Sequence, residues 1–172
     1  MRLTTLKLKN FRGYRGETVV GFDDLTAFVG KNDVGKSTIL EALDIFFNDK
    51  NSVAKIEKGD INKQSQQDGD TDICISACFS ELPERIVIDS SNETSFSAEY
   101  LLNESSELEI VKKYPNGGTA KVYVRANHPK NPMCCDLLSK TNAELKKLLN
   151  EQHIDCDDRT KNACIRTAIW RP

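Results

Sequence analysis

Alternating apolar and polar side chains open the chain and mark its first predicted strands. Between residues 3 and 11, Leu6 and Leu8 alternate with lysines, which is the pattern of a strand with one buried face. Glycines follow and predict a turn, and residues 17–20 form a second short run. A third run, residues 25–29, is short and mostly apolar. We therefore expect three strands before the first helix.

Helical spacing replaces this alternation further along. The apolar positions with that spacing are Ile39, Leu40, Leu43, Phe46 and Phe47. A face of this kind predicts an amphipathic helix. The segment that follows, residues 48–70, is polar and contains glycines, so we expect a largely solvated loop there.

Alternation returns in the middle of the chain. The predicted strands are residues 73–80, 85–89, 96–102, 108–114 and 121–125. Pro115-Asn116-Gly117-Gly118 separates the last two, and its residues tolerate the positive φ of a hairpin turn. The middle of the chain is therefore predicted to be an antiparallel β-meander.

The last third of the chain indicates helices. Thr141 and Glu144 form a capping box, which opens a helix whose leucines share one face. A second helix is expected over residues 158–170, and the sequence then stops without a cap, which we interpret as a truncated chain. We expect a first domain over residues 1–126, with a mixed sheet, one helix and the meander, and the start of a helical subdomain over residues 127–172.

Composition narrows the function classes. The net charge of −2 over 172 residues gives no excess of Lys and Arg, and such an excess is the usual footprint of a nucleic-acid binder. The sequence has neither a leader nor an apolar run of membrane-spanning length, so we expect a cytoplasmic protein. Its six cysteines show no C-x-x-C pair, and we expect free thiols rather than disulfides or a zinc site.

A phosphate-binding loop lies between the third predicted strand and the first predicted helix. It fits the pattern G-x-x-x-x-G-K-[ST], and its residues are Gly30, Lys31, Asn32, Asp33, Val34, Gly35, Lys36, Ser37 and Thr38. The two glycines allow successive N–H groups to point at an anion. Lys36 is expected to reach the β- and γ-phosphates, and the Ser37 hydroxyl to bind Mg²⁺. The predicted cofactors are therefore ATP and Mg²⁺.

These motifs together resemble a known family. The run 6–14, which contains Asn10-Phe11-Arg12, and the form G-x-N-x-x-G-K-S-T of the loop are similar to the N-terminal lobe of the ABC-type ATPases of the SMC, RecF and OLD (overcoming lysogenization defect) group. Asp33 stands where transporter ATPases usually have glycine, which is similar to OLD-like members, many of which serve in bacteriophage defence. The resemblance implies an α/β fold: a P-loop NTPase lobe with an antiparallel β-meander and C-terminal helices.

The resemblance also implies roles and partners. Asn32 would lie beside the γ-phosphate, Lys36 would be the catalytic lysine, and Arg12 would lie near the nucleotide or at the base of the lobe. Such ATPases hydrolyse ATP between two heads, so the resemblance implies a homodimer through the ATPase heads, with DNA or a nuclease or effector domain or subunit as a further partner. The sequence contains no LSGGQ-like signature segment, so we expect this chain to bind ATP but to hydrolyse it poorly.

Two other interpretations stay open at this point. In one, the run 85–89 presents Asp89 to Mg²⁺, and the chain is a self-contained small P-loop NTPase or kinase. In the other, the chain is an interaction module whose loop holds nucleotide only for stability.

Overall fold

The computed structural model describes residues 1–30, 35–48, 51–89 and 92–170. The chain forms two compact units. The first consists of Met1–Glu81 and Glu107–Arg125, and the second of Leu82–Ser106 and Ala126–Pro172. Residues 82–106, which the sequence places with the first domain, thus group with the C-terminal helices.

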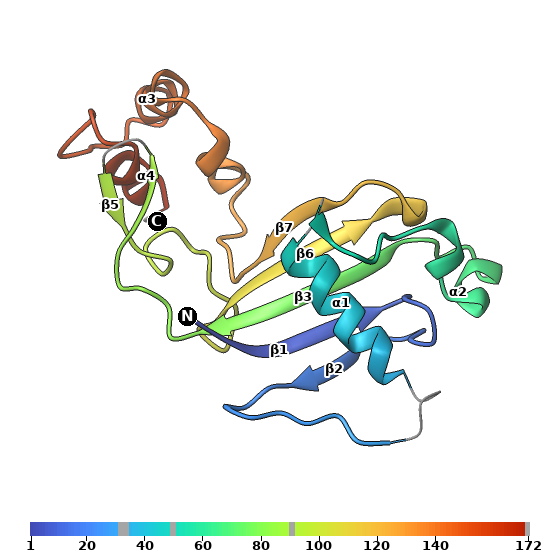
Figure 1. Ribbon diagram of the computed structural model, residues 1–172. Helices are drawn as coiled ribbons and strands as arrows, with labels where there is room; N and C mark the ends of the chain where they lie inside the picture. Colours follow the sequence, from blue (N-terminus) through green and yellow to red (C-terminus); the bar gives the residue numbers. More distant parts are fainter. Residues whose placement is uncertain (31–34, 49–50, 90–91, 171–172) are drawn as a thin grey trace. The chain divides into compact units, whose positions relative to one another are not determined.

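A five-stranded sheet forms the body of the first unit (Figure 1). Its strands are β1 (Arg2–Lys9), β2 (Thr18–Gly21), β3 (Ile73–Ser80), β6 (Leu108–Tyr114) and β7 (Lys121–Arg125). They lie in the order β2-β1-β3-β6-β7, and every neighbouring pair is antiparallel. The predicted antiparallel arrangement of the strands at 73–80, 108–114 and 121–125 is confirmed.

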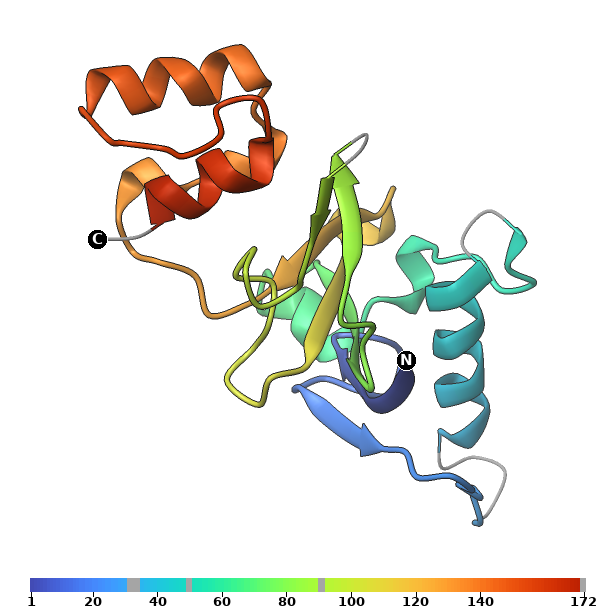
Figure 2. The same cartoon turned by 90° about the vertical axis from the view of Figure 1, so that its left-hand side faces the viewer.

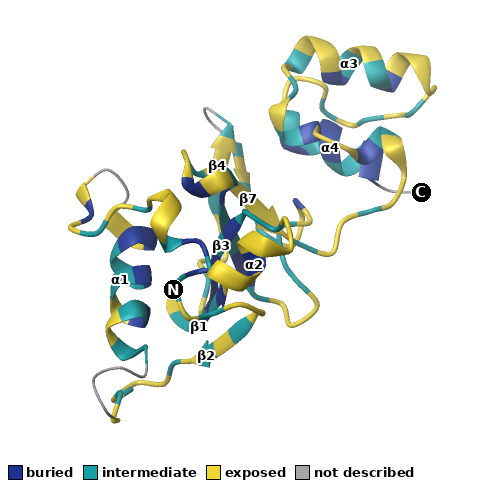
Figure 3. Cartoon of the chain, turned by 90° about the vertical axis from the view of Figure 1, so that its right-hand side faces the viewer, coloured by how far each residue is buried: buried dark blue, intermediate teal, exposed yellow. Residues whose placement is uncertain are grey.

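One long helix, α1 (Lys36–Asn48), lies along one face of this sheet (Figures 1 and 2). Its residues Ile39, Ala42, Ile45 and Phe46 are buried, and the rings of Phe46 and Phe79 lie 6.4 Å apart. Leu6 and Leu8 of β1 are fully buried. The predicted helix and the buried face of the first strand are therefore both confirmed, and Figure 3 shows the buried stripe of α1.

The predicted third strand, residues 25–29, is wrong. No strand forms there, and the side chains of Leu25 and Val29 are 89% and 92% exposed. A strand needs a neighbour for its N–H and C=O groups, but none of the described strands pairs with this segment. The apolar run alone therefore does not produce a strand.

The turn between β6 and β7 confirms the hairpin prediction. It contains the short 3₁₀-helix η3 (Pro115–Gly117), and both Asn116 and Gly117 have positive φ, at 52° and 65°. A Cβ added to Gly117 would lie 2.8 Å from the carbonyl oxygen of Glu57. The turn and the segment before η2 (Lys58–Asp60) therefore approach too closely for any side chain.

Gly117→Ala is expected to destabilise the first unit more than Gly69→Ala does. Gly69 has a similar φ of 83°, but nothing lies within 4 Å of its added Cβ, so that variant measures the backbone cost alone, about 1 kcal/mol. Gly117→Ala adds an overpacking cost of about 1–3 kcal/mol. Urea unfolding of both variants measures the difference, and equal midpoints would contradict the close approach.

Residues 51–70 contain more regular structure than the predicted loop. They contain η2 and the short helix α2 (Lys63–Gln67), in which the N–H groups of Gln64 and Ser65 donate to the side chain of Asn62. A capping residue can stabilise a single helical turn even where the sequence has little apolar periodicity. The spacing of apolar residues therefore gave no indication of α2.

The second unit combines a small hairpin with helices. Its elements are β4 (Ile86–Asp89), β5 (Asn92–Thr94), η4 (Pro132–Cys134), η5 (Leu137–Ser139), α3 (Asn142–Glu151) and α4 (Asn162–Trp170). The Thr141–Glu144 capping box is present at the start of α3, as predicted. α4 begins at Asn162 rather than at residue 158, because the Asp158 carboxylate accepts hydrogen bonds from the N–H and hydroxyl of Thr160 and stabilises a turn there.

The predicted strand at 96–102 is also wrong. Turns occupy residues 96–100, the N–H of Leu101 donates to the carbonyl of Phe96, and Tyr100 has a φ of 51°. The turn brings the Glu99 carboxylate to the buried guanidinium of Arg166. The ion pair between Glu99 and Arg166 therefore determines the backbone conformation here, although the alternating sequence predicts a strand.

Candidate functional site

The N-terminus of α1 lies within the predicted phosphate loop. Gly30, Gly35, Lys36, Ser37 and Thr38 are among the described residues, whereas Lys31, Asn32, Asp33 and Val34 lie outside them. The helix begins at Lys36, and its first internal hydrogen bond runs from the N–H of Ile39 to the carbonyl of Gly35.

This helix end suits an anion. The first N–H groups of a helix have no partner inside the helix, and the helix dipole makes that end positive. The first turn of α1 contains no acidic residue, so it carries no carboxylate of its own to neutralise that charge. Backbone amides at such a terminus are a recognised way to hold phosphate.

Lys36 and Ser37 lie at this terminus. The Nζ of Lys36 is 2.5 Å from the carbonyl oxygen of Gly30, so the ammonium group folds back across the loop that precedes its own helix. Ser37 is exposed in the first helical turn. An ammonium group and an exposed hydroxyl thus stand at the start of α1, and their chemistry fits a phosphate–Mg²⁺ group.

The second glycine of the motif is held against Tyr14. Gly35 has a φ of 84°, and a Cβ there would lie 2.7 Å from the Tyr14 Oη. The hydroxyl of Tyr14 also donates to the carbonyl of Gly35 at 3.3 Å. The sequence reasoning did not single out Tyr14 as a contact of the loop, since no short-range pattern connects residues 14 and 35.

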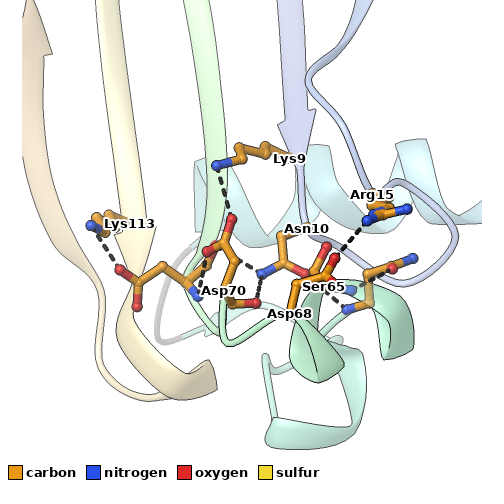
Figure 4. A network of polar contacts seen from close by, with 9 residues as sticks. Lys9, Asn10, Arg15, Ser65, Asp68, Asp70 and Lys113 are labelled. Carbon is orange, nitrogen blue, oxygen red and sulfur yellow. Dashed lines mark hydrogen bonds and ion pairs between the residues drawn. The ribbon is translucent and has the colours of Figure 1, made fainter.

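Tyr14 belongs to a turn that a buried asparagine fixes in place. Asn10 is fully buried, and its side-chain amide donates to the carbonyls of Asp70 and Asp72 at 2.8 and 3.2 Å. Its side-chain oxygen accepts from the N–H of Asn62 at 3.1 Å. Figure 4 shows Asn10 at the centre of this network.

Ion pairs surround Asn10 in the same view (Figure 4). They join Lys9 to Asp70 at 3.0 Å, Arg15 to Asp68 at 2.5 Å and Lys113 to Asp72 at 2.7 Å. The pKa of Asp70 is lowered, chiefly by its hydrogen bond with Lys9. The network ties the ends of β1, β3 and β6 to the segment after α2, so the turn that contacts Gly35 has a rigid base.

Arg12 connects this turn to the helix of the phosphate loop. Its Nε donates to Asp60 at 2.8 Å, and its guanidinium also pairs with Glu41 of α1. Burial alone would lower the pKa of Arg12, but its hydrogen bonds to Asp60 and Glu41 outweigh burial and hold that pKa above its ordinary value. Arg12 therefore connects the turn after β1 to α1, and its placement near the nucleotide or at the base of the lobe stays a prediction.

Asp89 is engaged elsewhere. It ends β4, which pairs only with β5 in a separate two-stranded sheet, and it belongs to the second unit. Its carboxylate lies 2.7 Å from Arg166 and accepts from Asn162 at 3.4 Å. These contacts make Asp89 a partner of the buried Arg166, and its role as a Mg²⁺-organising carboxylate stays a prediction.

Metal ligands, disulfides and membrane-spanning helices also bear on the chemistry of the described part of the chain. Across these residues no three His, Cys, Asp or Glu side chains gather as a metal-binding group. Each of the six cysteines is a free thiol. None of the helices in the described ranges combines the length and the apolar character that crossing a bilayer demands.

Comparisons with known proteins complete these observations. A family model described as AAA ATPase domain matches residues 1–169. Structural maintenance of chromosomes protein 1 from Schizosaccharomyces pombe is 38% identical over 52 residues, which are 30% of this chain and 4% of that protein. The protein of the same name from Caenorhabditis elegans is 35% identical over 57 residues, 33% of this chain and 4% of that one. The chain thus spans a small part of the length of both relatives.

Two solved structures are also similar. One comes from work on ATP-driven dimerization and DNA-stimulated activation of SMC ATPases; the match has 18% identity and a TM-score of 0.48, and covers 90% of this chain and 81% of that one. The other is the SMC head domain from Thermotoga maritima, with 17% identity and a TM-score of 0.42, covering 87% of this chain and 51% of that one.

Proposed function

The chain belongs to the AAA ATPase domain family, and we propose that it is the ATP-binding lobe of an SMC-like ATPase that holds the triphosphate at the N-terminus of α1. One observation carries the proposal. α1 begins inside the motif, at Lys36, and its first turn contains no acidic residue. The helix dipole, the first N–H groups and the lysine therefore favour an anion at the same place.

Each side chain of the site has a proposed part in binding. The ammonium of Lys36 moves from the Gly30 carbonyl to the β- and γ-phosphates, because a phosphate oxygen carries more negative charge than a carbonyl. The Ser37 hydroxyl holds Mg²⁺, which offsets charge on the phosphates when it is bound. Tyr14 and Arg12 position the loop and its helix from behind rather than bind the nucleotide, since their described contacts are to Gly35, Glu41 and Asp60.

The proposal extends to the larger assembly. The short matches to chromosome-maintenance proteins and the Asn10-Phe11-Arg12 motif support a machine in which ATP brings two heads together and DNA or an effector reads that closure. DNA processing and phage defence are the two roles proposed for it. Turnover by this chain alone is expected to be slow, since its sequence contains no signature segment to face the loop of a second copy.

Ser37→Ala is expected to weaken ATP binding in the presence of Mg²⁺ by about tenfold or more, which corresponds to about 1.4 kcal/mol. Binding measured in EDTA should change much less, because the lost hydroxyl acts through the metal. Titration calorimetry with and without Mg²⁺ measures both values. Ser105→Ala, an exposed serine outside the site, is the matched control, and equal losses with and without Mg²⁺ would contradict a metal-binding role for Ser37.

A further inference from the structure

The edge strand β7 is exposed along its whole length. It pairs with β6 through residues 121–125, and it is the last strand of the sheet (Figure 1). All five of its residues are exposed (Figure 3). Within the described ranges no strand pairs with its outer edge. In an antiparallel pair alternate residues turn their N–H and C=O groups away from the neighbour, so the outer edge presents a row of backbone donors and acceptors.

The side chains of β7 do not prevent a further strand from pairing with this edge. Natural edge strands are commonly blunted by a central charge, a proline or a bulge. Here the register with β6 is regular, and the three central residues Val122, Tyr123 and Val124 are apolar and 61%, 50% and 44% exposed. The two charges, Lys121 and Arg125, stand only at the ends. A strand of this composition favours pairing rather than preventing it.

A cavity adjoins the beginning of β7. It has a volume of about 420 Å³, and its lining includes Ile45 of α1, Ile56, Ala120 and Val122. Val122 and Val124 lie on the same side of the strand, and Val122 lines the cavity on that side. A partner strand laid against β7 would therefore find a mostly apolar pocket for a side chain opposite Val122.

The charges at the two ends of β7 are incompletely balanced. Lys121 stands directly opposite Lys113, whose ammonium already pairs with Asp72 at 2.7 Å. No carboxylate of the described residues forms an ion pair with Lys121. Arg125 lies 3.0 Å from the buried Glu109 and 3.7 Å from Glu17, but keeps 52% of its side chain exposed. Both ends of the strand can therefore accept a further carboxylate.

These charges argue against a second copy of the chain as the occupant. Two β7 strands paired about a two-fold axis at Tyr123 would place each Lys121 opposite Arg125 of the other copy. Like charges directly opposite in an antiparallel pair are destabilising. A strand with acidic residues in those two positions would instead form an opposite-charge pair at each end.

We propose that β7 is a docking edge for an extended segment of a partner protein with the pattern acidic–apolar–any–apolar–acidic. The segment adds a sixth antiparallel strand. Its two apolar residues stand opposite Val122 and Val124, and its two acidic residues stand opposite Lys121 and Arg125. Main-chain hydrogen bonds give the affinity, and the alternate side chains give the specificity. The proposal does not depend on nucleotide binding.

A synthetic peptide, acetyl-Thr-Glu-Val-Thr-Val-Glu-Thr-amide, is the probe. Hydrogen exchange of the chain with and without the peptide should show new protection at alternate amides of residues 121–125, since every second N–H already donates to β6. A peptide of the same composition with its valines and glutamates interchanged should bind more weakly. Equal binding of both peptides would show attraction by charge alone and would overturn the proposal, as would protection that lies away from β7.

Lys121→Glu supplies a second test that leaves the fold intact, because Lys121 is exposed. It should weaken binding of the acidic peptide by about threefold or more, because a favourable cross-strand pair becomes a repulsive one. It should also improve binding of a peptide with lysines in place of the glutamates. Lys130→Glu, also exposed, is the control. ATP affinity should be the same in both variants. An unchanged preference between the two probes, or self-association through β7 without peptide, would overturn the proposal.

Discussion

Lys36→Ala is expected to abolish measurable ATP binding by the chain. The ammonium group of Lys36 is a side-chain cation at the N-terminus of α1, and it donates to the carbonyl of Gly30. Hydrogen bonds to a charged group contribute about 1.5–3 kcal/mol each. Losing two of them corresponds to a loss of affinity on the order of 100-fold or more.

Titration calorimetry with Mg-ATP measures this loss. Lys130→Ala is the matched control because it removes an exposed lysine from outside the site. Circular dichroism of Lys36→Ala should match that of the unaltered chain, since Lys36 is only half-buried. A micromolar affinity retained by Lys36→Ala would count against the phosphate site.

Arg166→Ala is expected to have the largest effect on stability. The Arg166 side chain is fully buried and donates to both oxygens of Glu99 at 2.7 Å, while Glu99 itself is 1% exposed. Burial alone would lower the pKa of Arg166, but its bonds to Glu99 and Asp89 outweigh burial and raise that pKa. Removing the arginine leaves a buried carboxylate without its partner, which costs about 3–5 kcal/mol.

The single tryptophan reports this change directly. Trp170 lies on α4 and is buried, so its fluorescence follows unfolding of the second unit in urea. Arg85→Ala, which removes an exposed ion pair with Glu93, should cost at most about 1 kcal/mol. The double variant Arg166→Met with Glu99→Leu should recover much of the lost stability, because it removes the two fully buried charges and leaves only Asp89, whose side chain is 22% exposed. Equal costs for Arg166→Ala and Arg85→Ala would contradict a buried network.

Local signals predicted much of this fold. The alternation of Leu6 and Leu8, the capping box at Thr141 and the turn at Asn116-Gly117 each act within a few residues. Their effects can therefore be read without knowledge of distant partners. The start of the first predicted helix belongs to the same class, since Gly35, Lys36 and Ser37 are adjacent in sequence and α1 begins at Lys36.

The errors arose where distant residues decide the conformation. Residues 25–29 had strand composition but no neighbour, and Glu99 lay in an alternating run whose backbone instead turns toward Arg166. Within the site, the contacts of Tyr14 with Gly35 and of Arg12 with Asp60 join residues 21 and 48 positions apart. No short-range pattern indicates such contacts, so the support of the loop was visible only in three dimensions.

The most direct test of the phosphate site is a crystal structure of the chain grown with Mg²⁺ and a nonhydrolysable ATP analogue. We expect the triphosphate against the first turn of α1, the Nζ of Lys36 on its oxygens rather than on the Gly30 carbonyl, and the Ser37 hydroxyl on the metal. An analogue bound elsewhere, or a Lys36 ammonium still on Gly30 at saturating analogue, would contradict the account.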